Sequence, residues 1–146
     1  MKIQHDLHDN IKQVLAVAPV ILGATGVITG RVVDRKGYGG VEFIVEYGAV
    51  TTTGTVVTPI LMEGDTTGAL ASTANADMIG TEALAGLAGA TARTSGTTKL
   101  VSKRLGYKGN KRYLRLDLNG TGVTSVGIVA ASAVLFNPEA APISNP

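Results

Sequence analysis

The fold is decided by one seven-residue stretch, Val41-Glu42-Phe43-Ile44-Val45-Glu46-Tyr47. Its odd-numbered residues are large and apolar, and two of the even-numbered residues between them are glutamates. Because successive side chains of a β-strand point to opposite faces, this alternation places one face on a core and the other in water. The stretch therefore predicts a strand of an antiparallel sheet.

Further strand signals lie on both sides of this stretch. Val27–Asp34 and Thr55–Glu63 are both rich in β-branched residues, which favour strands. Pro59 cannot donate a hydrogen bond to a neighbouring strand, so we expect its strand at a sheet edge or at a bulge. The following residues, 64–98, hold few large apolar side chains and are interpreted as a surface excursion.

The last third of the chain predicts a hairpin and a buried strand. Lys99–Tyr107 and Lys111–Leu118 flank a short polar turn, and Asn119-Gly120 is the dipeptide that favours a second tight turn. Val123–Leu135 is apolar on both faces. We therefore expect this last strand in the middle of a sheet under a second layer, or at a subunit interface.

Two alternatives stand for the N-terminal segment. Leu7, Ile11, Val14 and Leu15 share one helical stripe, which predicts a short helix that is capped by Asp6 and ends before Pro19. An extended arm that becomes ordered only on a neighbour is the other reading.

These signals together predict an all-β fold, an antiparallel β-sandwich or barrel of jelly-roll-like form, with about seven strands. Residues 27–138 are expected to form a single β domain, preceded by the arm or short helix at 1–26 and followed by a loose tail at 139–146.

The composition argues against catalysis. The chain of 146 residues has no Cys and no Trp, and its two His both lie within the first eight positions. A thiol nucleophile and a Cys-ligated metal are therefore excluded. His5-Asp6-Leu7-His8-Asp9 lacks further oriented ligands, and Gly23–Gly30 lacks the strand–turn–helix context of a dinucleotide site. We expect no enzymatic activity, no cofactor and no bound metal.

We expect no membrane span and no secretion signal. The uncharged stretch Gln13–Gly30 is barely long enough to cross a bilayer, and Pro19 and three glycines interrupt it. Acidic residues stand before it, where a signal peptide has bases.

The basic residues are distributed unevenly. The net charge is only +2, which makes strong binding to nucleic acid an unlikely function. Seven of the thirteen bases nevertheless occur in one stretch that contains no acid, and we interpret them as a docking surface for an acidic partner: Lys99, Lys103, Arg104, Lys108, Lys111, Arg112 and Arg115.

This basic stretch also carries a family resemblance. The residues concerned are Ile79-Gly80-Thr81-Glu82, the run from Leu105 to Arg115 that contains Gly-Tyr-Lys-Gly-Asn-Lys-Arg-Tyr, and the strand that ends Leu135-Phe136-Asn137-Pro138. Over roughly residues 27–142 the chain resembles the small auxiliary head proteins of tailed bacteriophages, which are called cement or decoration proteins.

The resemblance implies a non-enzymatic structural protein on the capsid surface of a virion, with the major capsid protein as its partner. Closed symmetric assemblies are the default for small proteins, so a homo-oligomer is expected, with a trimer favoured by the symmetry of the lattice. Two alternatives remain: a tail or neck component of the same particle, and a ligand-binding β-sandwich such as a carbohydrate module. The absence of Trp disfavours the second.

Overall fold

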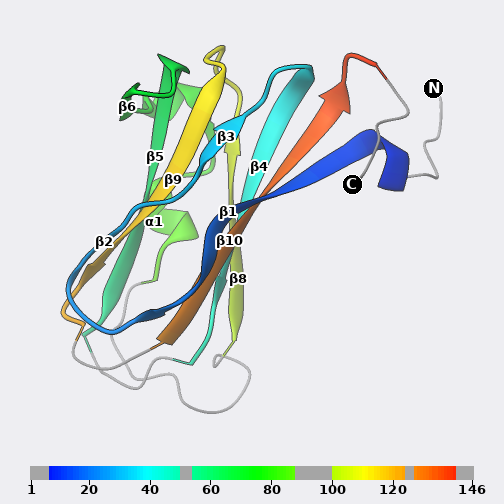
Figure 1. Ribbon diagram of the computed structural model, residues 1–146. Coiled ribbons are helices and arrows are strands. Elements are labelled where there is room, and N and C mark those ends of the chain that lie inside the picture. Colours follow the sequence, from blue (N-terminus) through cyan, green and yellow to red (C-terminus); the bar gives the residue numbers. More distant parts are fainter. Residues whose placement is uncertain (1–6, 50–53, 88–99, 124–126, 141–146) are drawn as a thin grey trace.

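The computed structural model describes residues 7–49, 54–87, 100–123 and 127–140, and these residues form two antiparallel sheets that pack face to face (Figure 1). The predicted all-β sandwich is confirmed. Among the described residues, no helix has the length and apolar character needed to cross a membrane.

Sheet A has the strand order β1-β10-β4-β8-β7. Its strands are β1 (Ile11–Leu22), β10 (Gly127–Pro138), β4 (Tyr38–Tyr47), β8 (Val101–Tyr107) and β7 (Met78–Ile79).

Sheet B has the order β2-β9-β5-β6, and β3 also pairs with β9. Its strands are β2 (Gly26–Ile28), β3 (Val32–Asp34), β9 (Tyr113–Thr121), β5 (Val56–Thr66) and β6 (Ala69–Ser72). The helical turns are short: η1 (His8–Asn10), η2 (Asn75–Asp77) and α1 (Glu82–Ala85).

The core lies between the two sheets. The odd-numbered side chains of residues 41–47 on β4 are all buried, as the alternation predicts. Leu114, Leu116 and Leu118 of β9 are fully buried within the same apolar core. β10 lies between β1 and β4, so the expectation of a strand in the middle of the sheet is confirmed.

The helix predicted near the N-terminus is wrong beyond the single turn η1. Residues 11–22 instead form the edge strand β1, which pairs with β10 from Ile11↔Phe136 to Leu22↔Gly127. This pairing satisfies the strand's backbone along one edge and buries Ala16 and Val17. A helix would have to give up those contacts, and β-branched residues favour the strand.

The strand predicted over residues 27–34 is interrupted at Gly30. A side chain at this position would overlap the carbonyl oxygen of Leu116, so the chain runs past β9 here without a Cβ. The Arg31 N–H donates to the Ala16 carbonyl at 2.7 Å. This bond joins the β2–β3 segment of sheet B to β1 of sheet A and closes one side of the sandwich.

The predicted hairpin is wrong in its pairing. β8 lies in sheet A beside β4, whereas β9 lies in sheet B beside β5, so residues 108–112 cross from one sheet to the other. Asn119 and Gly120 form no turn. They lie within β9, and a positive φ of 64° occurs only two residues later, at Gly122.

The expected edge position is wrong for the strand as a whole, because β5 lies between β9 and β6, but Pro59 itself lies where β5 has a strand on one side only. β9 pairs with one side of β5, but β6 covers the other side only from Met62 onward. On this open side Val57 donates to the Leu87 carbonyl at 2.9 Å, and Leu61 donates to the Glu82 carboxylate at 2.7 Å. Pro59 lies between them and has no N–H to satisfy.

Residues 64–87 are more ordered than a surface excursion. They contain β6, β7 and α1, and Ala85 is fully buried. The Tyr47 hydroxyl donates to the Ala85 carbonyl at 2.9 Å, and α1 packs against both β5 and β8. The helix thus closes the side of the sandwich opposite β1. Residues 88–98, and most of the tail expected at 139–146, lie outside the described residues.

Candidate interaction surfaces

The seven predicted docking residues do not form one patch. Lys103 and Arg104 are neighbours on β8 and point to opposite faces of sheet A, while Lys108, Lys111 and Arg112 lie at the crossing between the sheets. The two remaining residues are Arg115, which is on β9, and Lys99, which lies outside the described residues.

The Arg35 side chain holds residues 108–112, which form the crossing between the sheets, through hydrogen bonds. Its guanidinium donates to the carbonyls of Lys111 and Gly109, the second at 3.0 Å, and lies over the Tyr107 ring at 5.5 Å from the centroid. The Tyr107 hydroxyl donates to Glu63 and accepts from the Lys111 N–H. Burial, together with the hydrogen bond to Glu63, raises the pKa of Tyr107 well above its ordinary value. This network holds the crossing in a defined shape.

Acids from other strands balance the bases of the crossing. Lys111 Nζ lies 2.6 Å from the Asp65 carboxylate at the end of β5. Arg112 binds both carboxylate oxygens of Asp34 on β3, at 2.9 and 2.7 Å. The Arg112 hydrogen bond holds the pKa of Asp34 below its ordinary value. The run of bases without acids in the sequence is therefore not a run of unpaired charge in space.

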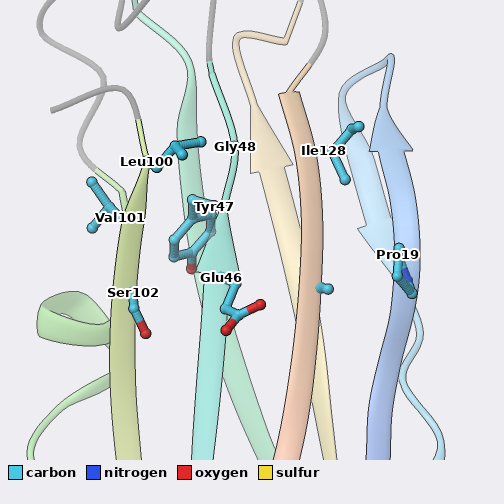
Figure 2. Close-up of a pocket in the computed structure, with 9 residues that line it drawn as sticks. Pro19, Glu46, Tyr47, Gly48, Leu100, Val101, Ser102 and Ile128 are labelled. Atoms are coloured by element: carbon cyan, nitrogen blue, oxygen red, sulfur yellow. The ribbon is translucent and has the colours of Figure 1, made fainter. Parts of the chain in front are cut away.

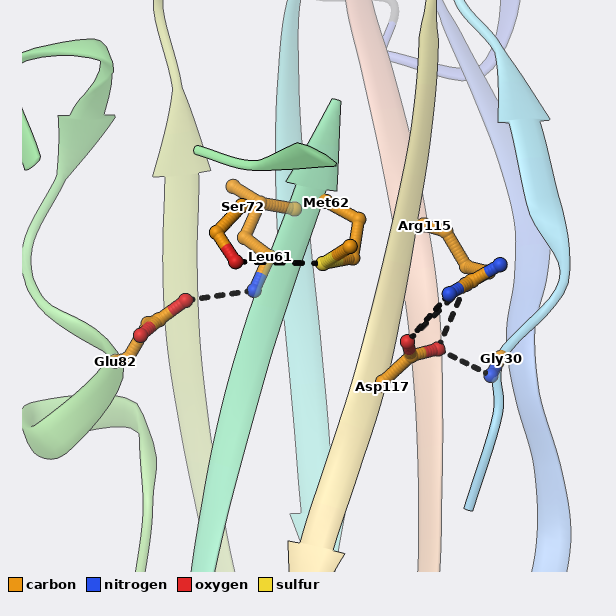
Figure 3. Close-up of polar contacts among 7 residues, drawn as sticks. All are labelled: Gly30, Leu61, Met62, Ser72, Glu82, Arg115 and Asp117. Atoms are coloured by element: carbon orange, nitrogen blue, oxygen red, sulfur yellow. Dashed lines mark hydrogen bonds and ion pairs between the residues drawn. The ribbon is translucent and has the colours of Figure 1, made fainter. Parts of the chain in front are cut away.

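Arg115 is also paired, in a nearly buried cluster on β9 (Figure 3). Its guanidinium donates to both oxygens of Asp117, which is 6% exposed, and the Gly30 N–H donates to the same carboxylate at 2.9 Å. Arg115 thus helps to anchor the β2–β3 segment.

In the described part of the chain, Lys103 and Lys108 have no ion-pair partner.

The outer face of sheet A is a surface that was not predicted from the sequence. This face consists of the even-numbered side chains of β4, β8 and β10, with their neighbours on β1. Its charged side chains in the described strands are Glu42, Glu46 and Arg104. Its apolar members that are at least partly exposed include Leu15, Pro19, Ile21, Ile44, Ile128, Ala130, Val134 and Phe136. The signal in the sequence was the apolar character of β10 on both faces.

A groove of about 600 Å³ lies at one end of this face (Figure 2). Pro19, Leu100, Ile128 and Ala130 contribute apolar wall, and the exposed Glu46 contributes a carboxylate. The groove can accept an apolar side chain together with a cation beside it.

The carboxylates of this face have unequal surroundings. Burial raises the pKa of Glu42, and Arg104, whose Nε lies 3.9 Å away, opposes the shift.

Across the described segments, no three of the His, Asp and Glu side chains gather as metal ligands would, and His5 and Asp6 lie outside those segments.

The sequence matches no protein-family model and no curated protein. Among solved structures, the fold is similar to the VP2 subviral particle of infectious bursal disease virus, with a TM-score of 0.50 and 10% identity over 88% of this chain. The chain spans 32% of that protein's length. The likeness shows the fold: this β-sandwich is one that a viral capsid protein also has.

Two further structures match with lower scores. One is the N-terminal part of the endo-1,4-β-D-xylanase 10B of Clostridium thermocellum, at a TM-score of 0.46 and 11% identity over 94% of this chain and 28% of the other. The other is a structure of the Gt strain of infectious bursal disease virus, at a TM-score of 0.39 and 11% identity over 96% of this chain and 47% of the other.

Proposed function

We propose that this chain is a non-enzymatic structural protein of a tailed-phage virion, which binds the assembled capsid as a cement or decoration protein. The observation that carries the proposal is the apolar outer face of sheet A, since a free-standing domain normally keeps such a face polar and contiguous apolar surface marks an interaction site. The likeness in fold to a viral capsid protein supports a structural role.

Repeated weak contacts are sufficient for this function. A protein that binds only the assembled shell shifts the equilibrium toward assembly by mass action. Many equivalent sites on the lattice add avidity without requiring a strong single contact. The proposal therefore needs complementary surfaces and no reactive group.

Among the seven basic residues, we propose Lys108, which is exposed at the crossing, as the main docking charge, with a smaller contribution from Lys103, which is half-buried on the inward side of β8 in register with Val45. Neither has an ion-pair partner in the segments that the structure describes, so each can pair with an acid of the major capsid protein. Lys111, Arg112 and Arg115 act instead as positioning residues, because Asp65, Asp34 and Asp117 already engage them. Arg104 lies on the outer face of sheet A.

Co-sedimentation with purified capsids of the same phage tests the proposal. The wild-type protein is expected to pellet with empty and DNA-filled capsids and to saturate at many copies per particle. Failure to bind either form contradicts the proposal. Gold labelling confined to the tail or neck would assign the chain to that part of the virion instead.

Charge reversal tests the main docking residue separately. Lys108→Glu is expected to weaken capsid binding while the β-sheet circular dichroism stays unchanged. Lys12→Glu, which reverses an exposed base on β1 far from the crossing in sequence, is the matched control and is expected to bind like the wild type.

A further inference from the structure

We propose that the outer face of sheet A binds the same face of a second copy of this chain, around a two-fold axis, which gives a dimer in place of the trimer expected from the sequence. The inference deepens the proposed function by naming the surface through which copies associate, and it rests on that function only for the expectation of self-association.

The composition of this face is that of an interface. Ile21 of β1 is 60% exposed and Ile128 of β10 is 57% exposed, and they are register partners on adjacent strands. The outer face of sheet B also exposes apolar side chains, those of Val27, Val32 and Val56, but its strand β9 places the Arg115–Asp117 ion pair and Asn119 among them. The difference lies within the sheets, because β10 has no charged residue whereas β9 carries an ion pair, and an apolar centre gains by being covered.

The size of the face fits a dimer. Its four long strands, at about 4.8 Å spacing, give a width of roughly 19 Å, and the ten residues of β4 span about 33 Å. The projected area is on the order of 600 Å² before the relief of the side chains is counted. A stable protein–protein interface buries about 800 Å² on each partner, which is comparable.

The charges on this face complement one another across a two-fold axis. The Arg104 side chain is 83% exposed. Its Nε lies 3.9 Å from Glu42 Oε1, which is the outer limit of an ion pair. Within the described residues, Glu46 has no ion-pair partner. The register places Arg104 beside Ile44 and Glu46 beside Ser102, in successive rows of the face.

An axis that crosses the strands between these two rows exchanges them between the copies. Each Arg104 then lies diagonally opposite the Glu46 of the second copy. The same operation sets Val134 against Ile128, so that an apolar side chain of one copy lies at the groove of the other. A two-fold contact forms each pair twice, which is the property of an isologous interface.

Sedimentation of the isolated protein tests the inference. The wild type is expected to be a dimer at micromolar concentration. Ile128→Glu is expected to be a monomer, because dimerisation would bury the new carboxylate in the interface. The matched control is Val27→Glu on β2, which alters a side chain of the same 57% exposure on sheet B and is expected to remain dimeric. A wild-type monomer or trimer, or a dimer that tolerates Ile128→Glu, overturns the inference.

A charge exchange tests the predicted pairing. Glu46→Arg and Arg104→Glu are each expected to weaken dimerisation about tenfold or more, because like charges then meet across the axis. The double variant is expected to recover to within about threefold of the wild type, since the pair is re-formed with reversed sign. Absence of recovery, with unchanged circular dichroism, contradicts the pairing.

Capsid binding is measured separately from the oligomeric state, so the two proposals can fail independently. A monomer that co-sediments with capsids overturns the dimer and leaves the proposed function intact. A dimer that binds no capsid supports the interface and contradicts the proposed function.

Discussion

At the scale of single residues, the most consequential polar group is Asp117. Its carboxylate is almost buried and receives hydrogen bonds from Arg115 and from the Gly30 N–H. Asp117→Ala leaves a partly buried guanidinium and a backbone donor unpaired, and we expect a loss of about 3 kcal/mol in the free energy of unfolding. Chemical denaturation measures the loss.

The control for this prediction is Asp65→Ala. Asp65 pairs with Lys111 at the surface, where its side chain is 69% exposed, so removal is expected to leave the denaturation midpoint nearly unchanged. Equal effects of the two variants would show that Asp117 does not anchor the β2–β3 segment.

Two carboxylates with opposite pKa shifts predict opposite pH dependences. Burial raises the pKa of Glu42, so its contribution to stability is complete at low pH and is lost as the pH rises through the raised pKa. Glu42→Gln, which stays neutral, is therefore expected to be more stable than the wild type near neutral pH. The difference should vanish below the ordinary titration range of glutamate.

Asp34 provides the opposite sign in the same experiment. Its pKa is lowered by Arg112, so its contribution is present above the ordinary aspartate range and is lost on acidification. Asp34→Asn is expected to be less stable than the wild type near neutral pH and to match it in acid. Unfolding curves across pH, at one protein concentration, test both variants. Curves that shift in the same direction would contradict the assignment.

Residue-level prediction from the sequence succeeded where one face of a strand decides the outcome. The buried and exposed positions of residues 41–47 followed from alternation alone. The ion pairs of Lys111, Arg112 and Arg115 did not follow, since two of the three acids, Asp34 and Asp65, come from strands distant in sequence. A run of basic residues in a sequence does not predict which acidic residues will pair with them in the folded protein.

At the scale of elements, β1 differs most from the structure that the sequence predicts for it. It pairs along β10 and contributes Ala16, Val17 and Leu22 to the core, whereas the turn η1 before it buries no residue. Deletion of residues 1–10 is therefore expected to preserve the cooperative thermal unfolding transition. Deletion of residues 1–22 is expected to abolish it, because β10 becomes an uncovered edge and the core is exposed.

Circular dichroism measured during heating checks both truncations. A cooperative transition that survives the longer deletion would mean that β1 is an accessory arm after all. Loss of the transition in the shorter one would assign the turn η1 a structural role that its exposure does not predict.

Strand positions in the last third were predictable, but their partners were not. The polar turn near residue 109 located β8 and β9, and the apolar run after Val123 located β10, each to within a few residues. The short connection between β8 and β9 favoured a hairpin, yet Arg35 and Tyr107 hold this connection as a crossing between two sheets. Local pattern identifies a strand, whereas the choice of neighbour depends on residues elsewhere in the chain.

At the scale of the whole molecule, contacts between the sheets close the sandwich along both sides. The Arg31–Ala16 bond closes the side at β1, and α1 closes the side between β5 and β8. The outer face of sheet A is left with its apolar side chains exposed. This arrangement is suited to a protein that acts through the surfaces it presents to neighbours.

The most direct measurement of the central claim is a difference map between electron cryomicroscopy reconstructions of particles with and without this protein. Added β-sandwich density is expected at regular lattice positions over the capsid shell. Identical shells, or added density only at the tail, would contradict it.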